Sequence, residues 1–263
     1  MIEMFNEISD NKEAVRECQI WLIKQKQTQA WKTTKATADA VYSILLGGDN
    51  LLASTKLVDV SLGSNKVKPE NVEAGTGFYQ QKFNPSEIKS ELGSVEITKH
   101  DPGVAWGSLH WQYLEDMSKV TPHTATPLRL SKEIYIRENE KTGKVLKPIN
   151  RDLKPGDELL VRLILRTDRD MEFVHLKDQR GSGTEPVNVL SRYKYQDGLA
   201  YYESTRDASS HFFIDYLPKG NYVFEYPVKI FHRGRYQTGI ANIQSMYAPE
   251  FNSHSASQWL EVK

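Results

Sequence analysis

The sequence predicts a mainly β protein: an antiparallel β-sandwich with a second, smaller β segment and an N-terminal pair of α-helices. Three observations lead to this fold class. Apolar residues recur at helical spacing mainly before Gly48, whereas the chain after Leu57 alternates apolar and polar residues. Proline and glycine interrupt the alternating segments often, as turns between short strands require. Aromatic residues make up 10% of the chain, and these side chains favour strands.

Two amphipathic helices are predicted, at residues 13–27 and 31–48. In the second helix, Thr33 or Thr34 can cap the start, and the glycines at 47–48 can end it. Each helix carries an apolar stripe that it cannot bury alone, so we expect both to pack against further structure. The stripes consist of Ala14, Val15, Cys18, Trp21 and Leu22 in the first helix, and of Ala36, Ala40, Val41, Ile44 and Leu45 in the second.

Residues 51–121 contain the smaller β segment. "KLVDVSLGSNKV" (56–67) alternates apolar and polar residues, and the aromatic-rich "VAWGSLHWQYLED" (104–116) predicts a long strand. The next stretch, "MSKVTPHTATPL", has two prolines and little apolar content, which favours a domain boundary near Pro122. The predicted parts are therefore 1–50, 51–121 and 122–263.

Residues 122–263 hold short alternating segments separated by turns such as "LKPGDE" and "LPKGN", which is typical of a sandwich. The clearest segments are "LRLSKEIYIRE", "DELLVRLILRT", "MEFVHLKDQ", "GLAYYEST", "HFFIDYLPKGNYVFEYPVKIFHRG" and "SQWLEVK". Pro227 cannot donate to a ladder and predicts an edge or a bulge. The residues expected to share one face of its segment are Tyr222, Phe224, Tyr226, Val228 and Ile230.

Charge and composition exclude several classes of protein. Lys and Arg number 34, as do Asp and Glu, and the sequence pI is about 7.1, so no basic excess points to nucleic acid. No apolar run approaches the ~18–20 residues of a membrane span. The first residues lack the pattern of a signal peptide. Cys18 is the single cysteine, which excludes an internal disulfide, and we interpret it as a small apolar residue of the helical stripe.

The polar residues give no metal or phosphate site. No two of the seven histidines have the spacing of a zinc pair. Asp168, Asp170 and Glu172 alternate as calcium ligands do, but arginines at 166 and 169 favour a charged turn between strands. Gly181 and Gly183 lack the following Lys-Ser or Lys-Thr of a phosphate loop, so we expect a flexible hairpin loop or an exposed connection.

The sequence also lacks a catalytic constellation. Ser209, Ser210 and His211 adjoin, but adjacency in sequence is not the geometry of a catalytic triad. The Gly-x-Ser-x-Gly elbow of many hydrolases is absent. We therefore predict a protein that is not an enzyme and uses no cofactor and no metal.

The order of helices, strand block and sandwich resembles the C-terminal end of bacterial alpha-2-macroglobulin-like proteins, especially those of Bacteroidetes. "WKTTKATADAVYSIL" looks like the closing helix of their thioester domain, a toroid of paired helices. "PGVAWGSLHWQYLEDMSKV" is similar to the strand that leaves their CUB-like domain. Four further stretches resemble the last domain of these proteins, which is a macroglobulin-like sandwich of the immunoglobulin-like type: "DRDMEFVHLKDQR", "EPVNVLSRYKYQDGLAYYESTRD", "HFFIDYLPKGNYVFEYPVKIFHRGRYQTGIANIQSMYAPEF" and "NSHS".

The resemblance implies the C-terminal part of an endopeptidase inhibitor that traps proteases after cleavage of a bait segment. It implies a periplasmic, cell-surface or extracellular location, with target endopeptidases and the other domains of the same protein as partners. The bacterial thioester sequence is Cys-Leu-Glu-Gln, whereas Cys18 stands in "ECQIW", so Cys18 is not assigned that role. Two unpartnered helices also predict self-association.

One residue is predicted to take part in interdomain binding. The stretch "SMYAPEF" is expected to form an exposed aromatic edge in which Tyr247 docks on the helical domain. The alternative is that Tyr247 caps the sandwich core. A second function left open by the composition is a surface adhesion or carbohydrate-binding module, which would display its aromatic side chains on a concave platform.

Overall fold

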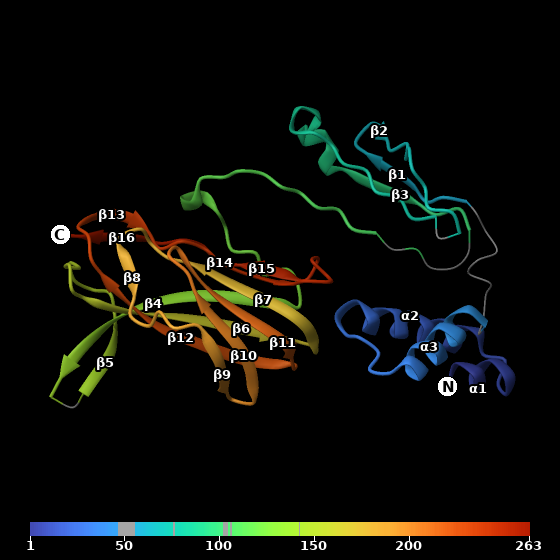
Figure 1. Ribbon diagram of the computed structural model, residues 1–263. Helices are drawn as coiled ribbons and strands as arrows, with labels where there is room; N and C mark the ends of the chain where they lie inside the picture. Colours follow the sequence, from blue (N-terminus) through green and yellow to red (C-terminus); the bar gives the residue numbers. More distant parts are fainter. Residues whose placement is uncertain (47–55, 76, 102–104, 106, 142) are drawn as a thin grey trace. The chain divides into compact units, whose positions relative to one another are not determined.

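The computed structural model describes residues 1–46, 56–75, 77–101, 105, 107–141 and 143–263. They form two compact units (Figure 1): Met1–Lys26 with Trp31–Leu109, and Gln27–Ala30 with His110–Lys263. Strands hold 41% of the residues and helices 18%, which confirms the mainly β fold class. The finer division at residues 50 and 121 stays a prediction. Among the described residues, no helix is both long enough and apolar enough to span a bilayer.

The first unit begins with helices α1 (Ile2–Glu7), α2 (Lys12–Thr28) and α3 (Thr34–Leu46). Thr33 caps α3 as predicted, because its Oγ1 accepts a hydrogen bond from the Ala36 N–H at 3.1 Å. Gln19 of α2 reaches the last turn of α3 and donates from Nε2 to the Ile44 carbonyl at 3.0 Å. The predicted end of this helix, the glycines at 47–48, lies outside the described residues.

The apolar stripes of the helices are only partly covered. Val15 of α2 and Ala40 of α3 are buried, at 1% and 7% exposure. Val41 and Leu45, by contrast, are 44% and 41% exposed and line an open groove together with Trp31. An apolar face therefore remains on the outside of α3 among the described residues.

A small antiparallel sheet follows, with strand order β2-β1-β3. Its strands are β1 (Asp59–Leu62), β2 (Asn65–Lys66) and β3 (Val95–Thr98), and short 3-10 helices lie at Pro85–Glu87, Ser90–Gly93 and Met117–Lys119. The long strand predicted at 104–116 is wrong, since its described residues, 105 and 107–116, form no strand. Tyr113 and Leu114 are 78% and 104% exposed, so no layer covers this stretch and apolar content alone did not produce a strand.

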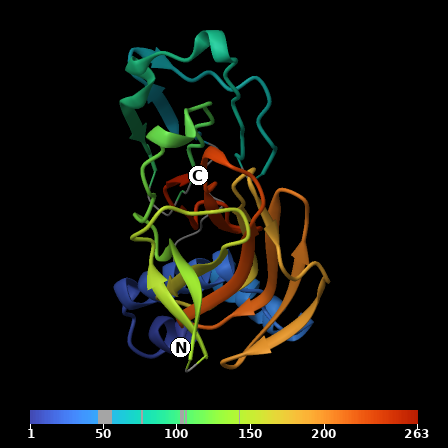
Figure 2. The ribbon, with the colours of Figure 1, turned by 90° about the vertical axis from the view of Figure 1, so that its left-hand side faces the viewer.

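The second unit is a sandwich of two antiparallel sheets with an additional two-stranded sheet. The six-stranded sheet runs β15 (Asn252–His254), β14 (Ala241–Ser245), β7 (Met171–Gln179), β11 (Ser209–Leu217), β10 (Leu199–Thr205), β9 (Arg192–Gln196). The five-stranded sheet runs β5 (Gly143–Pro148), β4 (Leu128–Glu140), β6 (Glu158–Thr167), β12 (Gly220–Ile230), β8 (Thr184–Pro186). Strands β13 (Gly234–Gln237) and β16 (Trp259–Val262) pair with each other. Strands β5 and β9 lie at opposite sides of the sandwich (Figure 2).

The core lies between the two sheets, where alternate residues of each strand point inward. On β12 the predicted inner face is confirmed, because Phe224, Tyr226, Val228 and Ile230 are all buried. The other fully buried large side chains come from both sheets and include Leu128, Leu130, Leu163, Leu165, Met171, Leu176, Phe212 and Ile214.

Pro227 sits where a missing N–H costs least. The N–H and C=O of one strand residue point to the same side, and the Pro227 carbonyl accepts from Val187 N–H at 3.2 Å. The side that lacks a donor therefore faces β8, which pairs with β12 only at residues 228–230. The ladder to β6 on the other side continues through Pro227 opposite Leu160. The predicted edge or bulge is wrong, because β12 lies between β6 and β8 and its register with β6 continues through Pro227; the missing N–H lies instead just beyond the end of the β8 pairing.

Candidate functional site

Tyr247 belongs to an exposed group of side chains beside β7 and β14, which we call the aromatic tip and which consists of Phe173, Met246 and Tyr247. The Tyr247 side chain is 79% exposed, and its ring meets the Phe173 ring edge-on, with centroids 5.3 Å apart. Met246 is 57% exposed, and its N–H donates to the Phe173 carbonyl at 2.9 Å. The tip offers apolar area with one hydroxyl, a composition common at protein interfaces.

The backbone of the tip is held in an uncommon conformation. Phe173 has φ of 55°, in the left-handed region, which a bulky residue enters only when its surroundings impose it. Its neighbours Met171 and Val174 are buried at 0% and 1% exposure, and they anchor both sides of the distortion. Strain of this kind costs about 1–3 kcal/mol and is concentrated at functional sites.

The segment "SMYAPEF" assigns its core and surface roles to different residues. Ala248 and Phe251 are buried at 2% and 9% exposure and belong to the sandwich core. Tyr247, at 79%, points to solvent and does not cap that core. Its docking on a helical domain stays a prediction.

Ser209 and His211 do meet, on the outer face of the six-stranded sheet. Ser209 Oγ lies 2.9 Å from His211 Nε2, and His211 Nδ1 lies 2.9 Å from His175 Nε2. Ser210 points the other way and accepts from Arg180. A triad needs a carboxylate where this row has His175, so the row lacks the group that would stabilise an imidazolium.

The His175–His211 pair predicts a loss of stability in acid. Partial burial lowers the pKa of both rings, and Lys177 lowers both further, as does His175 for His211. The folded pKa lies below the unfolded value of about 6.5, so the unfolded chain binds more protons in this range. We therefore expect the free energy of unfolding to decrease as pH falls from about 7.5 to 5.

Urea denaturation of the chain at a series of pH values measures this slope. A variant with His175→Gln and His211→Gln is the matched control and should lose part of the slope. An identical slope in the variant and the parent would contradict the assignment.

The acidic stretch forms the charged turn that was predicted. Residues 168–170 connect β6 to β7, and Asp168 Oδ1 accepts from Arg169 Nε at 2.8 Å. Asp170 accepts from the Tyr216 hydroxyl and from the Lys219 N–H, both at 2.7 Å, which lowers the pKa of its carboxyl. Within the part of the chain that the structure describes, no three His, Cys, Asp or Glu residues gather as metal ligands would.

The glycine loop is not the exposed connection that the sequence predicted. Gly181 and Gly183 are both buried. A Cβ at Gly183 would lie 2.3 Å from Tyr236 Cε1, and one at Gly181 would lie 2.8 Å from the Gln237 carbonyl oxygen. These glycines serve close packing of the loop against β13, not flexibility.

Cys18 is half-buried on α2.

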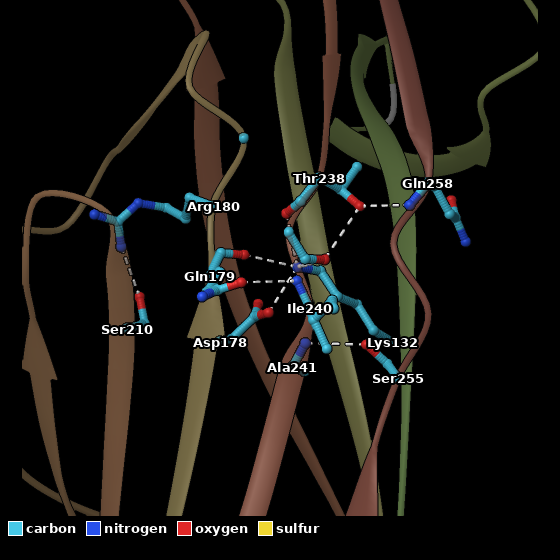
Figure 3. Close-up of polar contacts among 12 residues, drawn as sticks. Lys132, Asp178, Gln179, Arg180, Ser210, Thr238, Ile240, Ala241, Ser255 and Gln258 are labelled. Atoms are coloured by element: carbon cyan, nitrogen blue, oxygen red, sulfur yellow. Dashed lines mark hydrogen bonds and ion pairs between the residues drawn. The ribbon is translucent and has the colours of Figure 1, made fainter. Parts of the chain in front are cut away.

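A cluster that the sequence search missed lies inside the sandwich: the buried polar cluster of Lys132, Asp178 and Tyr226. Figure 3 shows Lys132 and Asp178 with their neighbours. Lys132 Nζ on β4 donates to Asp178 Oδ1 on β7 at 2.6 Å, and the Tyr226 hydroxyl on β12 donates to Asp178 Oδ2. The side chains of Lys132 and Asp178 are 3% and 0% exposed. The cluster thus joins the two sheets through their cores.

The surroundings of Lys132 Nζ are also polar. It donates to the backbone carbonyls of Gln179, Thr238 and Gly239 at 2.9, 3.0 and 3.3 Å. Burial lowers the pKa of Lys132 and raises the pKa of Asp178, and the attraction between the two groups opposes both shifts. One signal was available in the sequence: in "LRLSK" and "VHLKD", Lys132 and Asp178 occupy inward positions of alternating strands.

Comparison with known proteins identifies the sandwich. The family model of the bacterial alpha-2-macroglobulin MG10 domain matches residues 128–250. Over these residues the sandwich is similar to the MG10 domain of bacterial alpha-2-macroglobulins. This confirms the family resemblance seen in the sequence. The aromatic tip and the buried polar cluster both lie within the residues that this family model matches. No curated protein matches the chain.

Three solved structures are among those that are similar to the chain. Salmonella alpha-2-macroglobulin reacted with methylamine is 21% identical, with a TM-score of 0.42 over 55% of this chain and 10% of that one. Native Escherichia coli alpha-2-macroglobulin from domain MG7 to the C-terminus is 17% identical, with a TM-score of 0.42 over 56% and 25%. Escherichia coli alpha-2-macroglobulin activated by porcine elastase is 17% identical, with a TM-score of 0.48 over 100% and 23%. The chain therefore spans 10% to 25% of the length of these three structures.

Proposed function

We propose that this chain is the C-terminal, non-catalytic part of a bacterial alpha-2-macroglobulin-type endopeptidase trap. In this role it takes part in interdomain packing and in the conformational response to bait cleavage. The observation that carries the proposal is the match of residues 128–250 to the family model of the bacterial MG10 domain. The row of Ser209, His211 and His175, which has a histidine where a triad has its acid, supports the absence of catalysis. The family relationship favours a periplasmic, cell-surface or extracellular location.

Protease protection in the full natural protein tests the trap. Escherichia coli alpha-2-macroglobulin is described as activated by trypsin and by porcine elastase, so these two proteases are suitable probes. After incubation with the protein, each protease should keep its activity on a small peptide substrate and lose activity on a large protein substrate. Undiminished cleavage of the large substrate would count against the proposal.

We further propose that Tyr247 docks the MG10 domain on the helical domain of the same protein. Replacing Tyr247 with alanine should weaken binding between this chain and the separately produced helical domain by about tenfold, since truncating a central tyrosine of an interface costs about 1–2 kcal/mol. The free energy of unfolding should change by less than about 0.5 kcal/mol, because the side chain is 79% exposed.

Tyr193→Ala is the matched control for this variant. Tyr193 is 76% exposed on β9, at the other end of the same sheet. Surface plasmon resonance should show normal binding for this control. Equal binding by the Tyr247→Ala variant would refute the docking role.

The helical pair is proposed to be the closing part of a thioester-type helical toroid. Val41 and Leu45 on the outside of α3 would then face other helices of that toroid. In the 263-residue chain the same face is expected to drive self-association, which sedimentation velocity at increasing concentration would measure. A variant with Val41→Asp and Leu45→Asp should sediment as a monomer. A parent chain that is monomeric at every concentration would contradict this expectation.

A surface adhesion or carbohydrate-binding module is the second candidate. It is favoured by Tyr193 and Tyr195 on β9, which are 76% and 77% exposed. By contrast, the rings of His175 and Phe213 on the same sheet stack on one another, with centroids 4.7 Å apart, so the two stacked faces are not open to a sugar. Titration of tyrosine fluorescence with oligosaccharides distinguishes the two functions, since saturable quenching that is lost in Tyr195→Ala would favour the module.

A further inference from the structure

We propose that Lys132 and Asp178 are a covalent modification site, at which an amide bond forms between Lys132 Nζ and Asp178 Cγ. The bond would cross-link β4 to β7 and so join the two sheets of the sandwich. It would be intramolecular and would need no other protein. The inference does not depend on the proposed protease trap, because it concerns only the buried polar cluster.

Proximity is the first argument. Lys132 Nζ and Asp178 Oδ1 are 2.6 Å apart, and both side chains are almost fully excluded from solvent. The strands that carry them are fixed by long ladders, β4 with β6 and β7 with β11. Reacting groups held at contact distance avoid the entropy cost of a bimolecular encounter, which is worth several orders of magnitude in rate.

Protonation is the second argument. Amide formation needs a neutral amine and a neutral carboxylic acid, and burial favours the neutral form of each group. The pKa of Lys132 is lowered and that of Asp178 is raised, so a proton passing from Nζ to the carboxylate generates the reactive pair. Their mutual attraction opposes this transfer, and we therefore expect a slow, single reaction during maturation of the folded chain.

The surrounding groups complete the site. Backbone carbonyls of Gln179 and Thr238 accept N–H bonds from Nζ, which leaves the lone pair of the neutral amine to the carboxyl group. The Tyr226 hydroxyl donates to Asp178 Oδ2, and burial raises its pKa well above the usual value, so it keeps its proton. A donor on this oxygen withdraws electrons from Cγ and supports the charge that develops in the tetrahedral intermediate.

The reaction balances without a co-reactant. Nζ attacks Cγ, a C–N bond forms, and the Cγ–O bond to the protonated oxygen breaks. The amine gives up one hydrogen, the acid gives up a hydroxyl, and one water leaves. No atom is oxidised or reduced. A cavity of about 10 Å³ is lined by Lys132, Tyr226 and Thr238, and its volume is close to the smallest that holds one water.

Mass spectrometry of the denatured full chain tests the proposal. The intact mass should be about 18 Da, one water, below the sequence mass. Trypsin should leave Lys132 uncut and release a branched peptide that joins residues 130–137 to residues 178–180. An intact mass equal to the sequence mass, with cleavage after Lys132, would overturn the proposal. Loss of water without the branched peptide, as in a succinimide at Asp178, would overturn it too.

Two variants separate chemistry from packing. Lys132→Arg keeps a cation at the site but its guanidinium is too weak a nucleophile, so no water should be lost. Tyr226→Phe keeps the ring and removes the hydroxyl, and the cross-linked fraction should accumulate more slowly in newly synthesised chains sampled over time. An unchanged rate in Tyr226→Phe would remove Tyr226 from the mechanism, and water loss in Lys132→Arg would refute Lys132 as the nucleophile.

Discussion

Replacing Asp178 with alanine lowers the free energy of unfolding by about 3–5 kcal/mol, the typical cost of removing one partner from a buried ion pair. The side chain is 0% exposed, and its loss leaves Lys132 Nζ in the core with backbone carbonyls but no anion. The hydroxyl of Tyr226 loses its acceptor in the same step. This figure applies to the ion pair; if the pair is joined by the amide, the variant also loses the constraint that the cross-link places on the unfolded chain.

Urea denaturation followed by circular dichroism measures the effect as a shift of the unfolding midpoint. The informative control is the double variant Lys132→Met and Asp178→Leu, which removes both charges and keeps similar volumes. With an ion pair at the site it should recover most of the lost stability, since apolar replacement of a whole buried pair is often neutral or stabilising. With the amide at the site the recovery should fail, because both variants lose the cross-link. A single variant that loses less than about 1 kcal/mol would show that solvent reaches the pair.

The periodic parts of the fold could be predicted from the sequence. Strands such as β7 and β12 are half-buried on one face, and alternation along the chain records that burial directly. The start of α3 was also predictable, because the Thr33 cap is a local interaction. Short strands such as β8 and β13 were missed, since three or four residues carry no period and their pairing depends on distant partners.

The candidate sites were hard to predict for the same reason, because they depend on residues that are distant in sequence. The sequence "SMYAPEF" left open whether Tyr247 is exposed or caps the core. Its Phe173 partner lies far away in sequence and takes a left-handed conformation that no local pattern indicates. The aromatic stretch at 104–116 misled for the opposite reason, since strand-favouring residues form no strand without a neighbour to complete the ladder. Lys132 and Asp178 are 46 residues apart, and only the pairing of the two sheets brings them together.

A substitution at Gly239 is expected to have the second large effect on stability, because a side chain at this position would meet backbone atoms. Gly239 has φ of 78°, which an L-residue with a Cβ adopts at a cost. An added Cβ would lie 2.6 Å from the Gln179 carbonyl oxygen and 2.7 Å from its carbonyl carbon. The Gly239 loop is tied down on the same side, since Gln179 N–H donates to the Ile240 carbonyl at 3.1 Å. The loop therefore cannot move away without breaking its own hydrogen bonds.

Gly239→Ala should lower the free energy of unfolding by about 2–6 kcal/mol, the sum of backbone strain and overpacking. Gly198→Ala is the matched control, because Gly198 has φ of 80° and a Cβ added there would meet no atom within 4 Å. Strain alone should cost the control about 1 kcal/mol. The difference between the two variants in urea denaturation isolates the contact with Gln179, and equal losses would show that the loop yields. A displaced loop would also withdraw the Gly239 carbonyl from Lys132 Nζ, so the stability of the buried polar cluster depends on a residue with no side chain.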